Sequence, residues 1–198
     1  MQIPTQEECF QLILHMEMLE NIVAHSFRVC QVATLLADEL IEADVVVNRE
    51  LVRASALLHD ITKTRSIKTG ERHADTGGQV LREQGYPEVG CIIEQHVVLN
   101  VCRPDEPLSE AEIVNYADKR VLHDQVVPLQ NRLAYILERY GLDEERRKRI
   151  RFMWEQTEQL ETKLFRCLEM TPAALENVQW DHALLDDFTR FRQALNVA

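Results

Sequence analysis

The chain has 198 residues, of which 45% are hydrophobic and 28% charged, a composition typical of a globular protein that can bury a sizeable core. A formal net charge of −11 argues against a general nucleic-acid-binding protein, which needs a basic face. No apolar run could span a bilayer, and the first residues lack the basic and apolar stretches of a signal peptide. Five cysteines without a CxxC pair indicate reduced thiols, so we expect a cytoplasmic protein. These cysteines are Cys9, Cys30, Cys91, Cys102 and Cys167.

Apolar residues recur with helical spacing along almost the whole chain, which predicts an all-α fold. Thr5 with Glu8 has the pattern of a capping box and opens a first helix that reaches about Glu20. A second helix is predicted over residues 21–43, with His25 on its apolar face. The other residues on that face are Val29, Val32, Leu36 and Leu40.

Four further helices carry residues with metal-binding side chains. One opens near Asn48 and ends at the dipeptide His59-Asp60. The next spans roughly residues 73–84 and begins with His73. Pro87 suits the first turn of a fifth helix, whose apolar face also includes His96. Ser109 with Glu112 forms a second capping box, and the helix that it opens carries Asp118 on an apolar face.

A basic, hydroxyl-rich segment follows Asp60 and is predicted to be a loop. Its charged residues are Lys63, Arg65, Lys68, Glu71 and Arg72. A solvated loop and an anion-binding loop are equally good interpretations, because the segment adjoins the His-Asp pair.

Residues 126–198 are predicted to add four more helices. They span about 129–141, about 143–169, a short stretch after Thr171-Pro172, and a last stretch after Asp181. This extension could cover the core, form a lid or mediate homo-oligomerisation, and covering the core is the default expectation.

The metal-competent residues on separate helices form a candidate site. A single histidine on an apolar face is more often a core residue with one hydrogen bond. Asp118 differs, because burying a carboxylate is costly unless it is paired or bound to metal. Imidazoles and carboxylates from several helices are how helical bundles build metal sites. The sequence therefore predicts a metal site that includes His25, His59, Asp60, His96 and Asp118. A second dipeptide, His123-Asp124, points away from the face of Asp118 and is left out of this set.

The spacing of these five residues and His73 resembles that of the HD superfamily of metal-dependent phosphohydrolases, in its six-ligand, binuclear subgroup. HDITK is similar to the family's HDIGK, and HADTGGQVLREQGYPEVGCIIEQH to its HAxxGAxxLxxxGxPxxxxxxIxxH stretch. NYADKRV is similar to its closing aspartate helix. The resemblance covers roughly residues 20–125. One departure is Thr62, which replaces the family's glycine and leaves the conformation of the turn after Asp60 open.

The resemblance implies an HD-domain helical bundle with a C-terminal helical extension. Residues 1–20 form an N-terminal helix, residues 21–125 the metal-binding catalytic core, and residues 126–198 an extension packed on that core. It also implies that one metal is held by His25, His59, Asp60 and Asp118. Asp60 would bridge to a second metal held by His73 and His96. Imidazole and carboxylate ligands suit one or two divalent ions of Mn, Fe, Co, Ni or Zn, with Mg at an oxygen-rich position.

The implied reaction is hydrolysis of a phosphate ester or anhydride by metal-activated water. The expected substrate is a small phosphorylated metabolite, by family analogy most often a nucleotide, with no membrane or nucleic-acid partner. Asp60 and Lys63 are the predicted catalytic residues, since the family lysine contacts the phosphate or stabilises the transition state. Arg72 is the first candidate for substrate binding. Arg28 and Lys119 are further candidates, although an exposed side chain lying along the surface is the plainer interpretation of both.

Two alternatives from other classes stay open. The same six-ligand pattern serves a minority of HD proteins that are di-iron oxygenases, for which iron dependence and oxygen consumption without phosphate release would be the signs. A non-catalytic, metal-binding regulatory module is the other alternative. The intact ligand set and Lys63 argue against that module, because a degenerate copy should have lost some of them.

Overall fold

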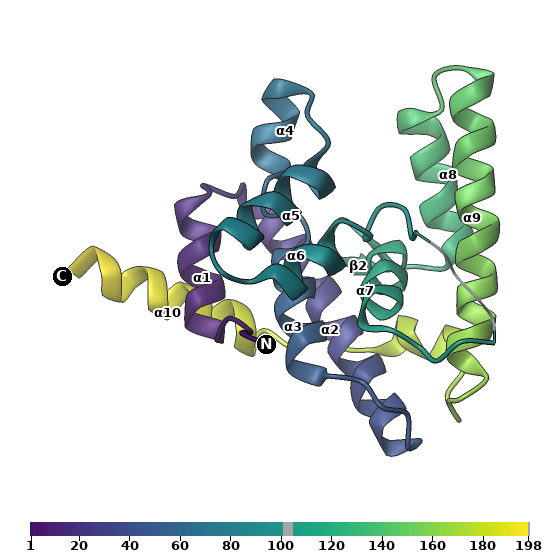
Figure 1. Ribbon diagram of the computed structural model, residues 1–198, viewed down its shortest axis with the longest axis horizontal. Coiled ribbons are helices and arrows are strands. Elements are labelled where there is room, and N and C mark those ends of the chain that lie inside the picture. The colour runs from purple at the N-terminus through teal and green to yellow at the C-terminus, as the bar shows by residue number, and fades with distance from the viewer. Residues whose placement is uncertain (101–104, 198) are drawn as a thin grey trace.

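The computed structural model describes residues 1–100 and 105–197. In this part of the chain the protein is all-α apart from one β-hairpin, whose two strands have two residues each (Figure 1). The predicted fold class is therefore confirmed. Cys102 lies outside the described residues. None of the helices in the described residues is both long and apolar enough to cross a membrane.

The helices of the first part of the chain follow one another with short connections. They are α1 (Gln6–His15), α2 (Glu20–Glu42), α3 (Arg49–Leu58), α4 (Lys63–Thr69), α5 (His73–Glu83), α6 (Pro87–Ile93) and α7 (Glu110–Lys119). The hairpin and the later helices are β1 (Val121–Leu122), β2 (Gln125–Val126), α8 (Leu129–Tyr140), α9 (Glu144–Phe165), the 3₁₀-helix η1 (Pro172–Asn177) and α10 (Ala183–Val197). The strands β1 and β2 pair antiparallel.

Helix starts follow the capping chemistry that the sequence predicts. Thr5 and Ser109 each form a complete capping box, at the starts of α1 and α7. The side chains of Asn48 and Asp143 accept from the first turns of α3 and α9. Each cap satisfies backbone N–H groups that the helix itself leaves free, so these residues fix where the helices begin.

Helix α2 lies at the centre of the core, against α3 and α7. Its predicted inner residues are all fully buried: Val29, Val32, Leu36 and Leu40. Helices α5 and α6 cross closely at two glycines, because a Cβ on Gly90 would lie 2.7 Å from the carbonyl oxygen of Gly78. This crossing brings the start of α5 beside the end of α6, where His73 and His96 lie.

Two local predictions were wrong. The basic segment after Asp60 is not a loop, because its first part forms α4. This helix has seven residues and ends at Gly70 with φ of 75°, too short to reveal an apolar period. The β1–β2 hairpin was not predicted either, since strands of two residues carry no readable alternation. The turn between them holds His123 with φ of 56°.

The helices after the hairpin make polar contacts with the core through α7. Lys163 of α9 and Glu112 of α7 form a buried ion pair of 2.7 Å. The Tyr116 hydroxyl donates to Glu161 over 2.5 Å. At the other side of the molecule, the ring of Phe188 in α10 packs edge-on against Phe10 with centroids 5.2 Å apart. Helices α8 and α9 stand side by side as a hairpin at one end of the molecule (Figure 1).

The thiols should divide into two reactivity classes. Burial raises the pKa of Cys9 to about 12 and that of Cys30 to about 11, whereas Cys91 and Cys167 are exposed. Because the thiolate is the reactive form, we expect the exposed pair to react with a disulfide reagent in the native protein and the buried pair to react only after unfolding. Thiol titration in a Cys102→Ser background measures this, and rapid native labelling of Cys9 or Cys30 would contradict it.

Candidate metal centre

The six residues predicted to bind metal come together in the structure. They are supplied by α2 (His25), the end of α3 (His59 and Asp60), the start of α5 (His73), the turn after α6 (His96) and α7 (Asp118). Five of the six are buried and His73 is partly exposed. The segments that the sequence placed on separate apolar faces therefore converge on one centre.

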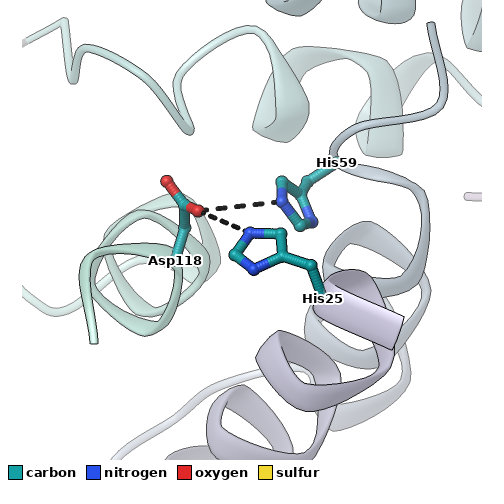
Figure 2. Close-up of side chains that lie close together, drawn as sticks. All are labelled: His25, His59 and Asp118. Atoms are coloured by element: carbon teal, nitrogen blue, oxygen red, sulfur yellow. Dashed lines mark hydrogen bonds and ion pairs between the residues drawn. The ribbon is translucent and has the colours of Figure 1, made fainter. Parts of the chain in front are cut away.

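One group of ligand atoms forms around Asp118. Its Oδ1 lies 3.1 Å from Nε2 of His25 and 3.8 Å from Nε2 of His59, as Figure 2 shows. The two imidazole rings are arranged edge to face, with centroids 5.3 Å apart. These three residues lie close enough together to hold a metal ion.

A second group forms around Asp60, whose two carboxylate oxygens face different imidazoles. Its Oδ2 lies 3.6 Å from Nε2 of His59. Its Oδ1 lies 3.1 Å from Nε2 of His73 and 3.5 Å from Nε2 of His96. This orientation is the one that a carboxylate shared between two ions requires.

Backbone carbonyls orient three of the four imidazoles. Nδ1 of His25 contacts the carbonyl oxygen of His123 at 2.7 Å. Nδ1 of His59 contacts that of Ala56 at 2.8 Å, and Nδ1 of His96 contacts that of Ile93 at 2.6 Å. A carbonyl oxygen can only accept, so in each ring Nδ1 carries a proton, and in the neutral form of the ring Nε2 carries a lone pair. Metal-binding histidines are held in this tautomer by such contacts.

These tautomers test whether the site fits a cation. In the neutral rings, the lone pairs of the Nε2 nitrogens point at carboxylate oxygens, so two hydrogen-bond acceptors face each other. Within the described residues, His59 Nε2 and Asp60 Oδ1 are buried without a hydrogen-bond partner. Leaving buried polar atoms unpaired costs free energy that a bound cation would recover. The donor set therefore fits a divalent metal.

The electrostatics of the site agree with that fit. Burial lowers the pKa of His59 to about 3, so this imidazole stays neutral. Burial alone would raise the pKa of Asp118, yet Lys119 and the other groups around it hold that pKa well below its usual range. Burial would also raise the pKa of Asp60, yet Lys63 and the other groups around it hold that pKa well below its usual range. Neutral imidazoles and ionised carboxylates are the protonation states that metals bind.

Two predicted cations lie at the site. Lys63 places Nζ 3.5 Å from Asp60 Oδ1 and 3.1 Å from His73 Nε2. Lys119 is 3% exposed, so its interpretation as a surface side chain was wrong. Its Nζ donates to Asp118 Oδ2 over 2.9 Å and to the His96 carbonyl over 2.7 Å, which links the two groups of ligands.

The other two predicted cations point elsewhere. The Arg72 side chain is 80% exposed and pairs with Asp75 at 3.1 Å. Arg28 is buried rather than exposed, but its guanidinium donates to the carbonyls of Val178 and Gln179 in the segment before α10. Arg28 therefore anchors the C-terminal segment instead of facing the metal centre.

Two features of the site were missed from the sequence. Arg132 of α8 lies 3.6 Å from Asp118 Oδ1, and its Nε is buried with no hydrogen-bond partner among the described residues. Nothing in the sequence marks Arg132, since it stands outside any motif. The His123 carbonyl that orients His25 was also missed, because the dipeptide was weighed by its side chains alone.

Thr62 fits its position without strain. Its φ of −102° is ordinary for any residue, so the turn needs no glycine. Its hydroxyl donates to the His73 carbonyl over 2.8 Å. Threonine therefore adds a contact that fixes the start of α5, where His73 lies.

The metal centre opens into a cavity of about 450 Å³ between the core and the α8–α9 hairpin. Its polar lining is Asp60, Lys63, Ser66, His73, His96, Asp118, Lys119 and Arg132. Its apolar lining includes Ile67, Val97, Ile136, Ile150 and Met153. The cavity thus joins cations and candidate metal ligands to an apolar wall.

Comparison with known proteins gives one family and several distant relatives. The sequence model of the family described as HD domain matches residues 22–121. An uncharacterized protein of Methanocaldococcus jannaschii is 29% identical over 144 residues, which cover 66% of this chain and 84% of that protein. Ribonuclease Y of Aquifex aeolicus is 32% identical over 97 residues, covering 48% of this chain but only 15% of the enzyme. A tRNA (cytidine(56)-2′-O)-methyltransferase of Picrophilus torridus is 28% identical over 143 residues, covering 65% of this chain and 39% of that enzyme. No solved structure matches the chain significantly.

Proposed function

The chain belongs to the HD domain family, and we propose that it is a metal-dependent phosphohydrolase that acts on a small phosphorylated metabolite. One observation carries the proposal above the others. The two oxygens of Asp60 face different imidazole nitrogens, and hydrogen bonds from Nδ1 to backbone carbonyls turn Nε2 of His59 and His96 toward that carboxylate. Such an arrangement suits two ions that share a carboxylate, which is a recurrent plan for hydrolysing phosphate esters.

We assign the six converging residues to two divalent ions. The first would be held by His25, His59, Asp60 and Asp118. The second would be held by Asp60, His73 and His96. Mn, Fe, Co, Ni and Zn suit these ligands, and Mg suits an oxygen-rich position. Bound there, the ions would lower the pKa of a water and neutralise charge on a phosphoryl oxygen.

The cations of the site have separate proposed roles. Lys63, partly exposed beside Asp60, is placed to donate to a phosphoryl oxygen. Arg132 has an unpaired Nε and a guanidinium that can hold two phosphoryl oxygens together. Lys119 is a positioning residue, because its two hydrogen bonds fix Asp118 and the turn that carries His96. We leave Arg72 and Arg28 out of the substrate site.

A nucleotide is the finer form of this proposal. It rests on the family resemblance and on the name of one relative, ribonuclease Y, which denotes an enzyme that cleaves RNA. The match covers only part of that enzyme, so its substrate is not carried over to this chain. Lys63 and Arg132 beside the metal centre suit an anionic, phosphorylated substrate.

The test is a phosphate-release screen over phosphorylated metabolites, with Mn, Fe, Co, Ni, Zn and Mg supplied in turn. Asp60→Ala protein provides the blank. We expect release above that blank with at least one metal. Oxygen consumption with iron, together with no phosphate release from any compound, would replace the proposal with the oxygenase.

Replacing His96 by alanine should remove one ion and leave the other. His96 faces Oδ1 of Asp60 together with His73, but it lies outside the group around Asp118. We therefore expect metal analysis to give about one ion per chain in place of about two. His182→Ala, which changes an exposed histidine outside the site, is the matched control. Unchanged stoichiometry in His96→Ala would remove His96 from the metal centre.

A further inference from the structure

The cavity at the metal centre continues along the α8–α9 hairpin. A second cavity of about 510 Å³ adjoins it, and both are lined by Tyr140, Ile150 and Met153. The same hairpin therefore forms one wall of both. The residues that line the second cavity are Val98, Tyr140, Leu142, Arg146, Arg149, Ile150, Phe152, Met153 and Gln156.

The two cavities together form a groove along the α8–α9 hairpin, and each of these helices presents one face to it. On α8 the lining residues Arg132, Ile136 and Tyr140 recur every four positions. On α9 the lining residues Arg146, Arg149, Ile150 and Met153 are spaced by three, one and three positions. Both spacings place the residues on a single helical face.

The order of charges along the groove follows from the turn between the helices. Arg132 lies near the start of α8, beside the metal centre, and Tyr140 ends α8 at the tip of the hairpin. Helix α9 starts back from that tip, so Arg146 and Arg149 lie far from the metal centre and Met153 lies nearer to it. The groove thus has cations at both ends and an apolar middle. Eight helical residues from Arg132 to Tyr140 separate the two ends by about 12 Å.

The far cations are available to a ligand. Within the part of the chain that the structure describes, no acidic residue lines the second cavity, although the whole sequence carries a net charge of −11. Among the described residues, Arg149 has no ion-pair partner within 4.0 Å. Arg146 pairs with Asp143 at 3.2 Å, but both side chains are more than half exposed and such pairs are worth only about 0–1 kcal/mol.

Apolar side chains are exposed around the same cations. Tyr140 is 52% exposed, Phe152 63% and Leu142 74%, and all three line the second cavity. Large exposed apolar residues that gather at one place indicate a binding surface. Aromatic rings beside arginines suit a ligand with planar or apolar parts and negative charge.

We propose that this groove selects an elongated substrate with two anionic groups. Its reacting phosphoryl group would lie at the metal centre, and its second anionic group would contact Arg146 and Arg149. Between them, an apolar or planar segment would pack on Ile136, Tyr140 and Met153. This inference rests on the proposed function and names its substrate class. A short oligonucleotide and an apolar metabolite with an acidic group at each end share this chemistry.

Two matched pairs of compounds distinguish these two sources of the substrate, the oligonucleotide and the apolar metabolite. One pair is a 5′-mononucleotide and the corresponding 5′-phosphorylated dinucleotide. The other is an alkyl monophosphate and the terminal bisphosphate of the same alkane. We expect the wild-type protein to prefer the doubly charged member of one pair by at least about ten-fold in KM and in calorimetric Kd. The pair that shows the preference identifies the source.

Charge-removing variants then locate the second anionic group. In Arg146→Gln/Arg149→Gln protein, the preference should fall to nearly one. Lys148→Gln removes a charge from the same turn of α9 without touching the cavity, so it should keep the preference. Circular dichroism checks that each variant is folded.

The groove and the proposed function fail in different ways. If the protein releases phosphate but prefers neither member of either pair, the proposed role of the groove is wrong and the proposed reaction is kept. The same conclusion holds if the double variant keeps the preference. A calorimetric preference lost in the double variant, with no phosphate release from any compound, would support the groove and overturn the reaction.

Discussion

Asp60→Ala protein should lose both ions, and its rate of phosphate release should fall by at least about 1000-fold. Removing a residue that only hydrogen-bonds to a metal ligand already lowers metal affinity or activity by about 10–100-fold, so removing a ligand itself should cost more. Among the described residues, Asp60 is the one whose carboxylate oxygens face both groups of imidazoles. Without it each group loses an anionic ligand, so the remaining histidines hold a divalent ion more weakly. We expect the metal-free variant to stay folded, because Asp60 Oδ1 has no hydrogen-bond partner among the described residues and its loss leaves no donor unsatisfied there.

The second His-Asp pair of the chain provides the control for this experiment. Asp124 follows His123 as Asp60 follows His59, but its side chain is exposed. Asp124→Ala protein should therefore keep its ions and its activity. Metal analysis, phosphate release and thermal unfolding are measured on both variants in parallel. An Asp60→Ala protein that retained two ions and full activity would end the assignment of the metal centre.

Much of this centre could be predicted because it depends on helical faces. His25 and Asp118 stand on apolar faces that must turn inward, so their meeting follows from packing two amphipathic helices. Two of the orienting contacts are equally local. His59 and His96 each contact the carbonyl three residues earlier, at the end of a helix, where carbonyls lose the backbone partner four residues on. Both contacts join residues only three positions apart, so the sequence could have predicted them.

The rest of the site depends on contacts that no local pattern encodes. Arg132 reaches Asp118 only because α8 leaves the β1–β2 hairpin in one direction, and that hairpin consists of two strands of two residues. The burial of Lys119 depends likewise on the turn after α6, whose His96 carbonyl accepts its second hydrogen bond. Sequence periodicity identifies which face is buried but not which distant segment covers it.

Arg120→Met should destabilise the protein by about 3 kcal/mol, because it leaves several buried acceptors without a donor. Arg120 ends α7 and is 1% exposed. Its guanidinium donates to the Val127 carbonyl over 2.9 Å, to the Tyr116 hydroxyl over 2.7 Å and to the Pro172 carbonyl over 3.0 Å. It also lies 3.4 Å from a carboxylate oxygen of Glu161. The Arg120 side chain thus joins helix α7 to the residue that follows strand β2, to α9 and to the start of η1.

Denaturant unfolding of the metal-free protein measures this loss, with Arg139→Met, an exposed arginine of α8, as the control. The position of Arg120 predicts a second effect. It lies two residues after Asp118, so loosening the end of α7 should also weaken metal binding, although Arg120 itself contacts none of the six candidate ligands. A variant that lost stability but bound metal with unchanged affinity would show that α7 is held by its own packing. The C-terminal helices would then cover the site without helping to build it.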